Sequence, residues 1–295
     1  MDVGIPGNAN LLERPWHQWL WMLPLVIGIA ALAIPTLTGI AQVSWSSEQG
    51  AHGPIVLAIA LWLLARVWPV MVKNASPGRG LIGWPLLGLS LVGYLIARLV
   101  GSITIESGML YISLVAALYL FFGARAMRIC WFPIVYLMFV LPPPGSVVAG
   151  ATQPLRLELS QLAVDLLGWL GYPVARAGLT IYVSQYVLEV KAACGGLNSM
   201  ISLTAIGLFY AYIRHNSNAR YIAVLFIAII AMAIAANYVR VLILILITYY
   251  LGDSAAQGFL HEFAGLTMFT VAIGGIMLFD QFGSPLRRAL ARPIS

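Results

Sequence analysis

The sequence is poor in charged residues. Asp, Glu, Lys and Arg make up only 9% of its 295 residues, whereas hydrophobic residues make up 61%. A soluble globular domain is typically about 25% charged, so this class of protein is excluded. The mean hydropathy of +0.92 indicates instead an all-α polytopic membrane protein, because a helix that spans a bilayer needs about 20 apolar residues. Spans of this length with short loops use up the whole chain, so we expect one integral-membrane domain over residues 1–295.

Cysteine, histidine and acidic residues are also scarce. The two cysteines and four histidines show no ligand spacing such as H-x-x-x-H, so the sequence implies no metal or other cofactor. Sixteen basic residues against ten acidic ones give a net charge of +6. The basic residues are dispersed between apolar runs, which indicates membrane orientation and no binding to nucleic acid. We expect no cleavable signal peptide, because the first apolar run is long enough to span and lacks a small-residue cleavage site.

Eight apolar runs predict about eight transmembrane helices. The fifth ends at the break Leu141-Pro142-Pro143-Pro144-Gly145, because no helix continues through three prolines. An even number of spans puts both termini on one side of the membrane. Most basic residues fall on that side, so we expect both termini in the cytoplasm. The predicted spans cover about 19–40, 53–72, 81–100, 106–122, 129–141, 195–213, 221–251 and 259–279.

Residues 146–193 have a different pattern from the apolar runs. Between residues 155 and 172 the polar residues Glu158, Gln161 and Asp165 recur at three- and four-residue spacing among leucines, which predicts an amphipathic helix. Residues 179–183 and 186–190 are rich in β-branched and aromatic side chains and are separated by two residues, which predicts a short hairpin. We expect both elements on the outer face of the membrane.

Three polar residues are expected to meet on that face. Cys194 opens the sixth predicted span there, and His261 opens the eighth. Arg240 lies twenty residues after the cytoplasmic Arg220, or about 30 Å along a helix, which brings it back to the outer leaflet. The topology therefore places a nucleophile, a cation and an imidazole at one depth.

The three side chains suit acyl transfer. At a helix N-terminus the thiolate of Cys194 is favoured by the helix dipole, and a nearby cation favours it further. Gly195 and Gly196 would let a substrate carbonyl approach backbone N–H groups, which are donors for an oxyanion. His261 could take the thiol proton and later protonate the leaving amine, and Arg240 could stabilise the thiolate or the oxyanion.

Plainer interpretations exist for individual residues. A lone cysteine in a membrane helix is usually an apolar filler, which is how we interpret Cys130. An arginine near a helix end usually extends to the interface, as we expect for Arg98. Asn237 could bond between helices, and Glu189 could pair with Lys191 in solvent.

These motifs resemble those of the exosortase/archaeosortase family of transpeptidase-like membrane proteins. The resemblance covers Leu141 to Gly265 and implies a catalytic core of about 141–280. It rests on the proline break, Asp165-Leu166-Leu167, Gly178, Leu188-Glu189-Val190, Ala193-Cys194-Gly195-Gly196-Leu197-Asn198-Ser199, Asn237-x-x-Arg240 and His261-x-x-x-Gly265. His261 favours the bacterial exosortase branch, and Gly195 stands where many members have serine.

The resemblance implies a cysteine protease or transpeptidase of the bacterial inner membrane, with its active site on the outer face. Its substrates would be exported proteins that end in a PEP-type sorting signal: a short motif, a membrane helix and a basic tail. Besides these partners we expect membrane lipids. The implied catalytic residues are Cys194, Arg240 and His261, and the supporting residues are Gly195, Gly196, Asn198, Ser199, Asn237 and Glu189.

Two other classes of function remain open at this point. In a membrane transporter or lipid flippase, Arg240, Asn237 and the broken segment near Pro142 would line a substrate path. Such a protein would tolerate Cys194→Ala. A non-catalytic assembly scaffold would tolerate changes at both Cys194 and Arg240.

Overall fold

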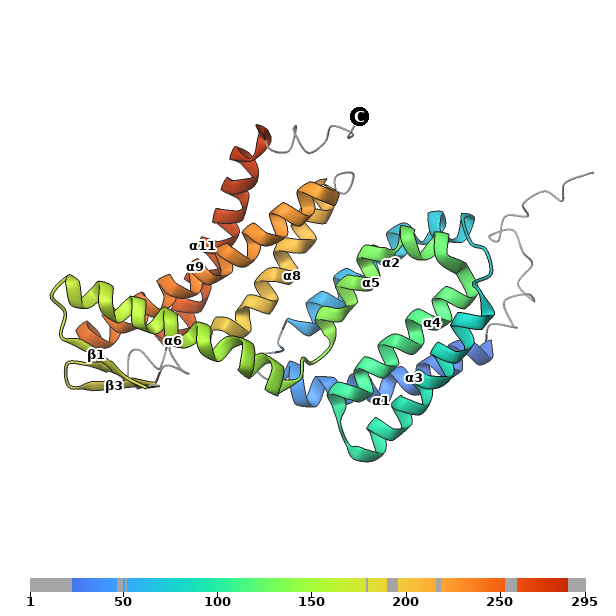
Figure 1. Cartoon of the computed structure of the whole chain (residues 1–295), viewed down its shortest axis with the longest axis horizontal. Helices are drawn as coiled ribbons and strands as arrows, with labels where there is room; N and C mark the ends of the chain where they lie inside the picture. Colours follow the sequence, from blue (N-terminus) through green and yellow to red (C-terminus); the bar gives the residue numbers. More distant parts are fainter. Residues whose placement is uncertain are drawn as a thin grey trace, which may run out of the picture. The chain divides into compact units, whose positions relative to one another are not determined.

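A computed structural model describes residues 23–46, 50, 52–178, 180–189, 196–215, 219–252 and 259–285. For residues 23–26, 151, 196–199, 219 and 259–269 the description covers the backbone alone. The chain divides into two compact units, residues 1–143 and 144–295, and we describe each by itself. The first is drawn in blue to green and the second in yellow-green to red (Figure 1).

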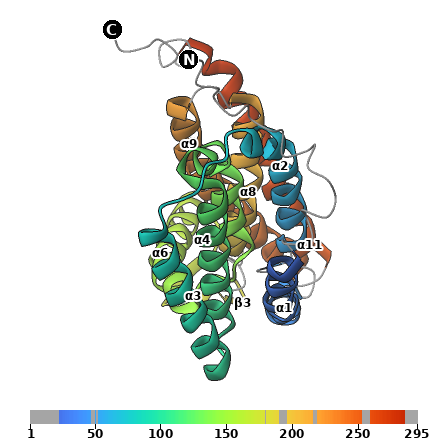
Figure 2. The ribbon, with the colours of Figure 1, turned by 90° about the vertical axis from the view of Figure 1, so that its right-hand side faces the viewer.

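The first unit is built from helices. Helices α3 and α4 form an antiparallel pair and lie side by side in both views (Figure 1 and Figure 2). Gly101 ends α3 with a φ of +74°, a left-handed conformation that glycine adopts without steric cost. The elements are α1 (Leu23–Ile40), η4 (Ala41–Trp45), α2 (Gly53–Lys73), α3 (Gly80–Val100), α4 (Ile103–Ile129), α5 (Trp131–Leu137) and η5 (Met138–Val140).

The outer surface of these helices is apolar. Leu81 and Leu99 on α3 are 90% and 88% exposed, which suits hydrocarbon as the surrounding medium and not water. Within the described residues, five helices are long and apolar enough to cross a membrane, and a sixth span results if the two helices flanking residues 141–144 count as one. The multi-pass architecture is therefore confirmed, while the number of eight stays a prediction. The five are Ile27–Trp45, Gly53–Lys73, Gly80–Val100, Ile103–Ile129 and Arg220–Leu251.

The fifth predicted span needs correction. Helix α5 and η5 together cover only residues 131–140, or about 15 Å, which is half the thickness of a hydrocarbon core. Leu141 is extended, with a ψ of 136°, and the three prolines that follow remove backbone donors and prevent a helix. This segment is thus too short to cross a membrane by itself, and at most it forms one bent span together with α6.

The fourth predicted span ends at 122, whereas α4 continues to Ile129. The backbone is nevertheless broken at the predicted end, because Gly123 has φ 72° and ψ 179°. The break leaves carbonyl groups without helical partners, and the loop after α2 supplies donors to them. Ser76 N–H donates to the Phe122 carbonyl and Gly78 N–H to the Leu120 carbonyl, each at 3.0 Å. This loop is therefore fixed against α4.

The second unit combines helices with a small antiparallel sheet of order β1-β2-β3. One face of the sheet carries Ile181, Val183 and Leu188, which are buried against α6 and α9 (Figure 1). The elements are α6 (Gly145–Trp169), β1 (Val174–Ala177), β2 (Thr180–Val183), β3 (Tyr186–Glu189), α8 (Gly196–His215), α9 (Ala219–Leu251) and α11 (Phe259–Phe282).

Both predictions for residues 146–193 are confirmed as secondary structure. The amphipathic helix is α6, with Glu158 and Asp165 exposed, although it begins ten residues earlier than predicted. The hairpin is β2–β3, and its turn uses Ser184 at a φ of 53° in place of glycine. Strand β1, which pairs with β2, was not predicted.

Helices α8, α9 and α11 pack through small side chains. Leu203 of α8, Ala233 and Ala236 of α9 and Ala272 of α11 form one buried cluster. Gly207 packs so closely against Ile229 that a Cβ atom added to Gly207 would lie 2.9 Å from the Ile229 side chain. Small residues at such positions let membrane helices approach closely.

Candidate active site

A buried carboxylate joins the ends of α8, α9 and α11. Asp280 of α11 is 1% exposed. Its Oδ1 accepts hydrogen bonds from His215 Nε2 at 2.7 Å and from the Tyr221 hydroxyl at 2.9 Å. Its Oδ2 accepts one from the Tyr210 hydroxyl at 2.8 Å and lies 3.0 Å from Arg214 Nε. These contacts hold the three helices at a common level.

This cluster gives a reference from which depth can be measured. Gly196 lies nineteen residues before His215 in α8 (196 to 215), Arg240 nineteen after Tyr221 in α9 (221 to 240), and His261 nineteen before Asp280 in α11 (261 to 280). Nineteen residues of helix rise about 28 Å. The contacts at Leu203, Ala236 and Ala272 keep the helices together in between. The beginning of α8, the beginning of α11 and Arg240 therefore lie at similar depth, roughly one hydrocarbon thickness from Asp280.

Arg240 and Asn237 lie at this depth on one face of α9, three residues apart. Arg240 is 6% exposed and Asn237 is 0% exposed. Neither amide atom of Asn237 has a hydrogen-bond partner among the described residues. A buried polar group without a partner typically costs about 1–3 kcal/mol, which makes this amide a candidate for binding a substrate. Arginine and asparagine inside a membrane bundle usually mark a functional site.

The other predicted site residues are described only in part. Cys194 and Gly195 lie outside the described residues, in the six-residue stretch between β3 and α8. Gly196 begins α8, and Asn198 and Ser199 follow in its first turn. His261 is the third residue of α11. For these helical positions the backbone is described and the side chains are not, so contacts among Cys194, Arg240 and His261 stay a prediction.

Glu189 is the last residue of β3 and is exposed, paired across the sheet with Thr180. Strand β3 thus ends five residues before Cys194. On β1, at the other edge of the sheet, Arg176 Nε donates to Gln161 Oε1 at 2.9 Å, and Gln161 donates to Asp165 at 2.8 Å. The polar stripe of α6 therefore fixes the sheet to that helix.

Two interactions were not predicted from the sequence. The Asp280 cluster joins residues 59 to 70 positions apart, and no local spacing reveals such a contact. In the first unit, Arg98 does not simply extend to the interface. Its guanidinium donates to Glu106 Oε1 at 3.1 Å, and the Thr36 hydroxyl donates to the same oxygen at 2.7 Å.

The second cysteine agrees with its plain interpretation. Cys130 is 0% exposed, and its thiol donates to the Ala126 carbonyl at 3.2 Å. Among the residues that the structure describes, no group of three or more His, Cys, Asp or Glu side chains is arranged to hold a metal ion.

Comparison with known proteins identifies a matching family. The family model described as transmembrane exosortase matches residues 44–278, which include Cys194, Arg240 and His261. No curated protein and no solved structure matches the chain.

Proposed function

Because the chain belongs to the transmembrane exosortase family, we propose that it is a membrane-embedded cysteine protease or transpeptidase that cleaves carboxy-terminal PEP-type sorting signals. Exosortases are generally membrane proteases or transpeptidases for sorting signals. The finer proposal concerns the substrates, the nucleophile and the side of the membrane. Exported proteins would be cut at the outer face of the bacterial inner membrane, between the exported domain and its membrane anchor.

The proposed reaction begins with the Cys194 thiolate attacking the scissile carbonyl. The C–N bond breaks, His261 gives a proton to the leaving amine, and the exported domain stays on sulfur as a thioester. Water or an acceptor amine then attacks the thioester and releases the thiol. Arg240 would stabilise the negative charge on the thiolate or on the tetrahedral oxyanion.

The observation that supports this proposal best is the burial of Arg240 beside Asn237. Both lie at the depth where α8 and α11 begin, and α8 begins two residues after Cys194. A cation in a site shielded from water stabilises a developing oxyanion more strongly than an exposed one does. The Asn237 amide has no partner among the described residues, so its NH₂ and carbonyl groups are candidates for bonds to a substrate.

The test replaces each cysteine in turn and measures processing of an exported reporter that carries a PEP-type signal. Cys194→Ala should abolish cleavage at matched membrane expression, because no acyl intermediate forms. Cys130→Ala is the matched control and should cleave normally, since Cys130 is a buried packing residue. Wild-type cleavage by Cys194→Ala would refute the cysteine mechanism.

The same burial of Arg240 and Asn237 is compatible with the competing class, a transporter or lipid flippase whose path these residues line. The cysteine test distinguishes the two. A transporter would lose flux on Arg240→Lys and keep it on Cys194→Ala, and a scaffold would tolerate both substitutions.

A further inference from the structure

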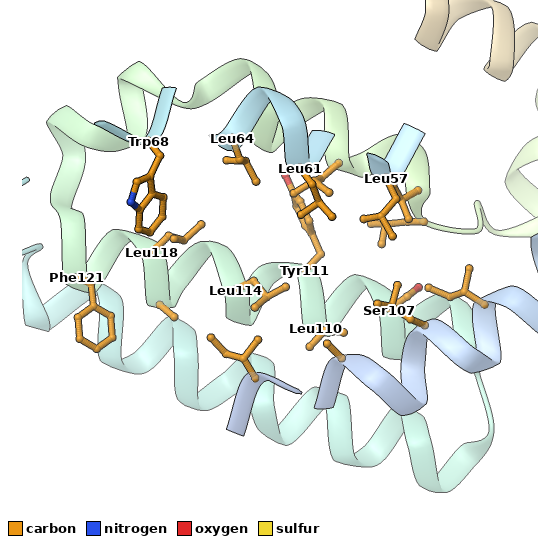
Figure 3. A pocket seen from close by; sticks show the side chains of 18 of the residues that line it. Leu57, Leu61, Leu64, Trp68, Ser107, Leu110, Tyr111, Leu114, Leu118 and Phe121 are labelled. Carbon is orange, nitrogen blue, oxygen red and sulfur yellow. The ribbon is translucent and has the colours of Figure 1, made fainter. Parts of the chain in front are cut away.

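The first unit contains an apolar cavity of about 480 Å³ between α1, α2, α4 and η5. Leu57, Leu61, Leu64 and Trp68 of α2 face a row of side chains on α4 across it (Figure 3). The two hydroxyl groups in the lining are already bonded: the Ser107 hydroxyl donates to the Thr104 carbonyl and the Tyr111 hydroxyl to the Ile134 carbonyl. The chemistry of the cavity therefore suits a hydrocarbon ligand.

The cavity is elongated. Its lining extends along α4 from Ser107 to Phe122, fifteen residues or about 22 Å. An extended hydrocarbon chain can lie along an apolar cavity of this length.

The cavity is open to the surroundings of the unit on one side. Leu61 is 55% and Phe121 51% exposed, whereas Leu110 and Ala117 are buried at its floor. In a bilayer, these exposed side chains border lipid tails. A chain could thus slide in sideways from the membrane.

Basic residues lie on the segments that continue from the end of the cavity at Trp68 and Phe121. Lys73 follows Trp68 by five residues within α2, and Arg125 follows Phe121 by four, just beyond the break at Gly123. Arg79 is brought to the same turn of α4, because its N–H donates to the Tyr119 hydroxyl at 3.3 Å. All three side chains are exposed and none forms an ion pair with a described residue.

Carboxylates that could neutralise these cations are lacking in the described part of this unit. Its one acidic residue there is Glu106, which is engaged by Arg98 and lies at the opposite end of the lining segment of α4. The apolar cavity thus ends on the side of three cations that have no carboxylate partner among the described residues. That combination matches an amphiphile with an anionic head.

We propose that this cavity binds one acyl chain of an anionic membrane phospholipid, whose phosphate lies against Lys73, Arg79 and Arg125. The chain contributes apolar burial and the phosphate contributes charge pairing, so binding requires both parts of the ligand. This site is independent of Cys194 and of the proposed reaction.

The first part of the test measures how binding depends on the charge of the lipid headgroup. Delipidated full-length protein in a neutral detergent is titrated with phosphatidylglycerol and, separately, with phosphatidylcholine of identical chains, and bound lipid is counted by native mass spectrometry. Phosphatidylglycerol should bind more tightly, and Arg125→Gln should weaken it roughly fivefold, the effect of one cation near a membrane surface. Arg220→Gln, in the second unit, is the matched control and should change nothing. Equal binding of the two lipids, or no effect of Arg125→Gln, would overturn the proposal.

The second part of the test measures whether the acyl chain of the lipid occupies the cavity. Leu114→Trp places a bulky side chain in the cavity and should abolish the bound lipid, whereas Leu89→Trp, on the exposed face of α3, should not. Ala117→Leu narrows the floor with a smaller change and should weaken binding if Leu114→Trp fails to fold. Glycerol phosphate, which has the headgroup charge without the chain, should not bind. Binding of glycerol phosphate as tight as that of the lipid, or unaltered lipid binding in both filled variants, would show that the cavity is not the site.

Discussion

At the scale of single residues, Arg240 can be either a structural cation or a positioned donor, and exchange for lysine separates the two roles. A cation that only balances charge would be replaced by lysine with little effect. If its guanidinium holds an oxyanion through paired N–H donors, lysine offers a differently shaped and more strongly hydrated contact. We therefore expect Arg240→Lys to insert normally and to lower turnover roughly a hundredfold.

The control for this prediction is Arg98→Lys. Arg98 is paired with Glu106 at 3.1 Å, and its side chain is 47% exposed, so lysine can keep the pair at little cost. The measurement is the ratio of cleaved to uncleaved substrate at matched membrane expression. Near-normal cleavage by Arg240→Lys would reduce Arg240 to a structural role.

The Asn237 amide allows a prediction in which stability and activity move in opposite directions. Because the amide is fully buried and lacks a partner among the described residues, Asn237→Leu removes a desolvation penalty and should stabilise the protein by about 1 kcal/mol. If the amide binds substrate, processing should fall in the same variant. Thermal unfolding in detergent and the processing assay test the two effects.

The matched control is Thr248→Val on the same helix. Thr248 is also 0% exposed, but its hydroxyl donates to the Leu244 carbonyl at 2.8 Å, so no stabilisation is expected. A less stable Asn237→Leu that still processes substrate would identify the amide as structural.

At the scale of elements, β3 is an edge strand of the sheet formed by the described residues, and this edge could pair with an extended substrate. In a two-residue hairpin the pair next to the turn, Val183 and Tyr186, exchanges hydrogen bonds, and by alternation so do Ile181 and Leu188. The backbone groups of Val187 therefore point away from β2. A cleavage motif added there as a further strand would be held by main-chain hydrogen bonds close to Cys194 in sequence.

Proline at position 187 removes only this outward donor, so it should leave the β2–β3 pairing intact. We expect Val187→Pro to impair processing while Cys194 still reacts with a small thiol reagent. Val187→Ala keeps the N–H and loses the 56% exposed side chain, so it should process normally. If both variants process substrate at the wild-type rate, β3 has no part in recognition.

The three helices that meet at Asp280 form the second element-scale test. Asp280→Asn keeps the shape of the side chain and removes the charge that His215 and Arg214 face. Loss of one partner of a buried ion pair typically costs about 3 kcal/mol. We expect a large fall in thermal stability and reduced processing, because the relative levels of α8, α9 and α11 are no longer fixed.

Asp165→Asn is the control, since Asp165 is exposed and bonds only Gln161 among the described residues. Equal melting temperatures for the two variants would mean that the Asp280 cluster does not hold the helices together.

The hairpin and the Asp280 cluster show which features of this chain are readable from sequence. Strands β2 and β3 were predicted because β-branched and aromatic residues mark them, whereas β1, with the sequence Val-Ala-Arg-Ala, lacks that composition. The buried position of Arg240 follows from its apolar neighbours along α9. Asp280 was missed because its partners lie on other helices, and only tertiary packing brings them within 3.0 Å.

At the scale of the whole molecule, the membrane character follows from composition, but the number of spans does not. The proline break leaves α5 and η5 too short to cross alone, so the fifth predicted span and α6 must be considered together. The equal nineteen-residue distances from the Asp280 cluster to Gly196, Arg240 and His261 link the three helices of the proposed site. This relation between the three helices does not depend on the number of spans in the first unit.

The central claim is that Cys194 forms a thioester with the substrate, and trapping that intermediate tests it most directly. Full-length protein in lipid nanodiscs is incubated with a purified reporter and hydroxylamine, a strong small nucleophile that cleaves thioesters. The hydroxylamine nitrogen attacks the acyl carbon, the Cys194 sulfur leaves as thiol, and the exported fragment acquires a carboxy-terminal hydroxamate. We predict that intact-mass analysis detects this hydroxamate with the wild type and Cys130→Ala and not with Cys194→Ala. Cleavage that yields only the free carboxylate, at a rate equal in the wild type and Cys194→Ala, would contradict the account.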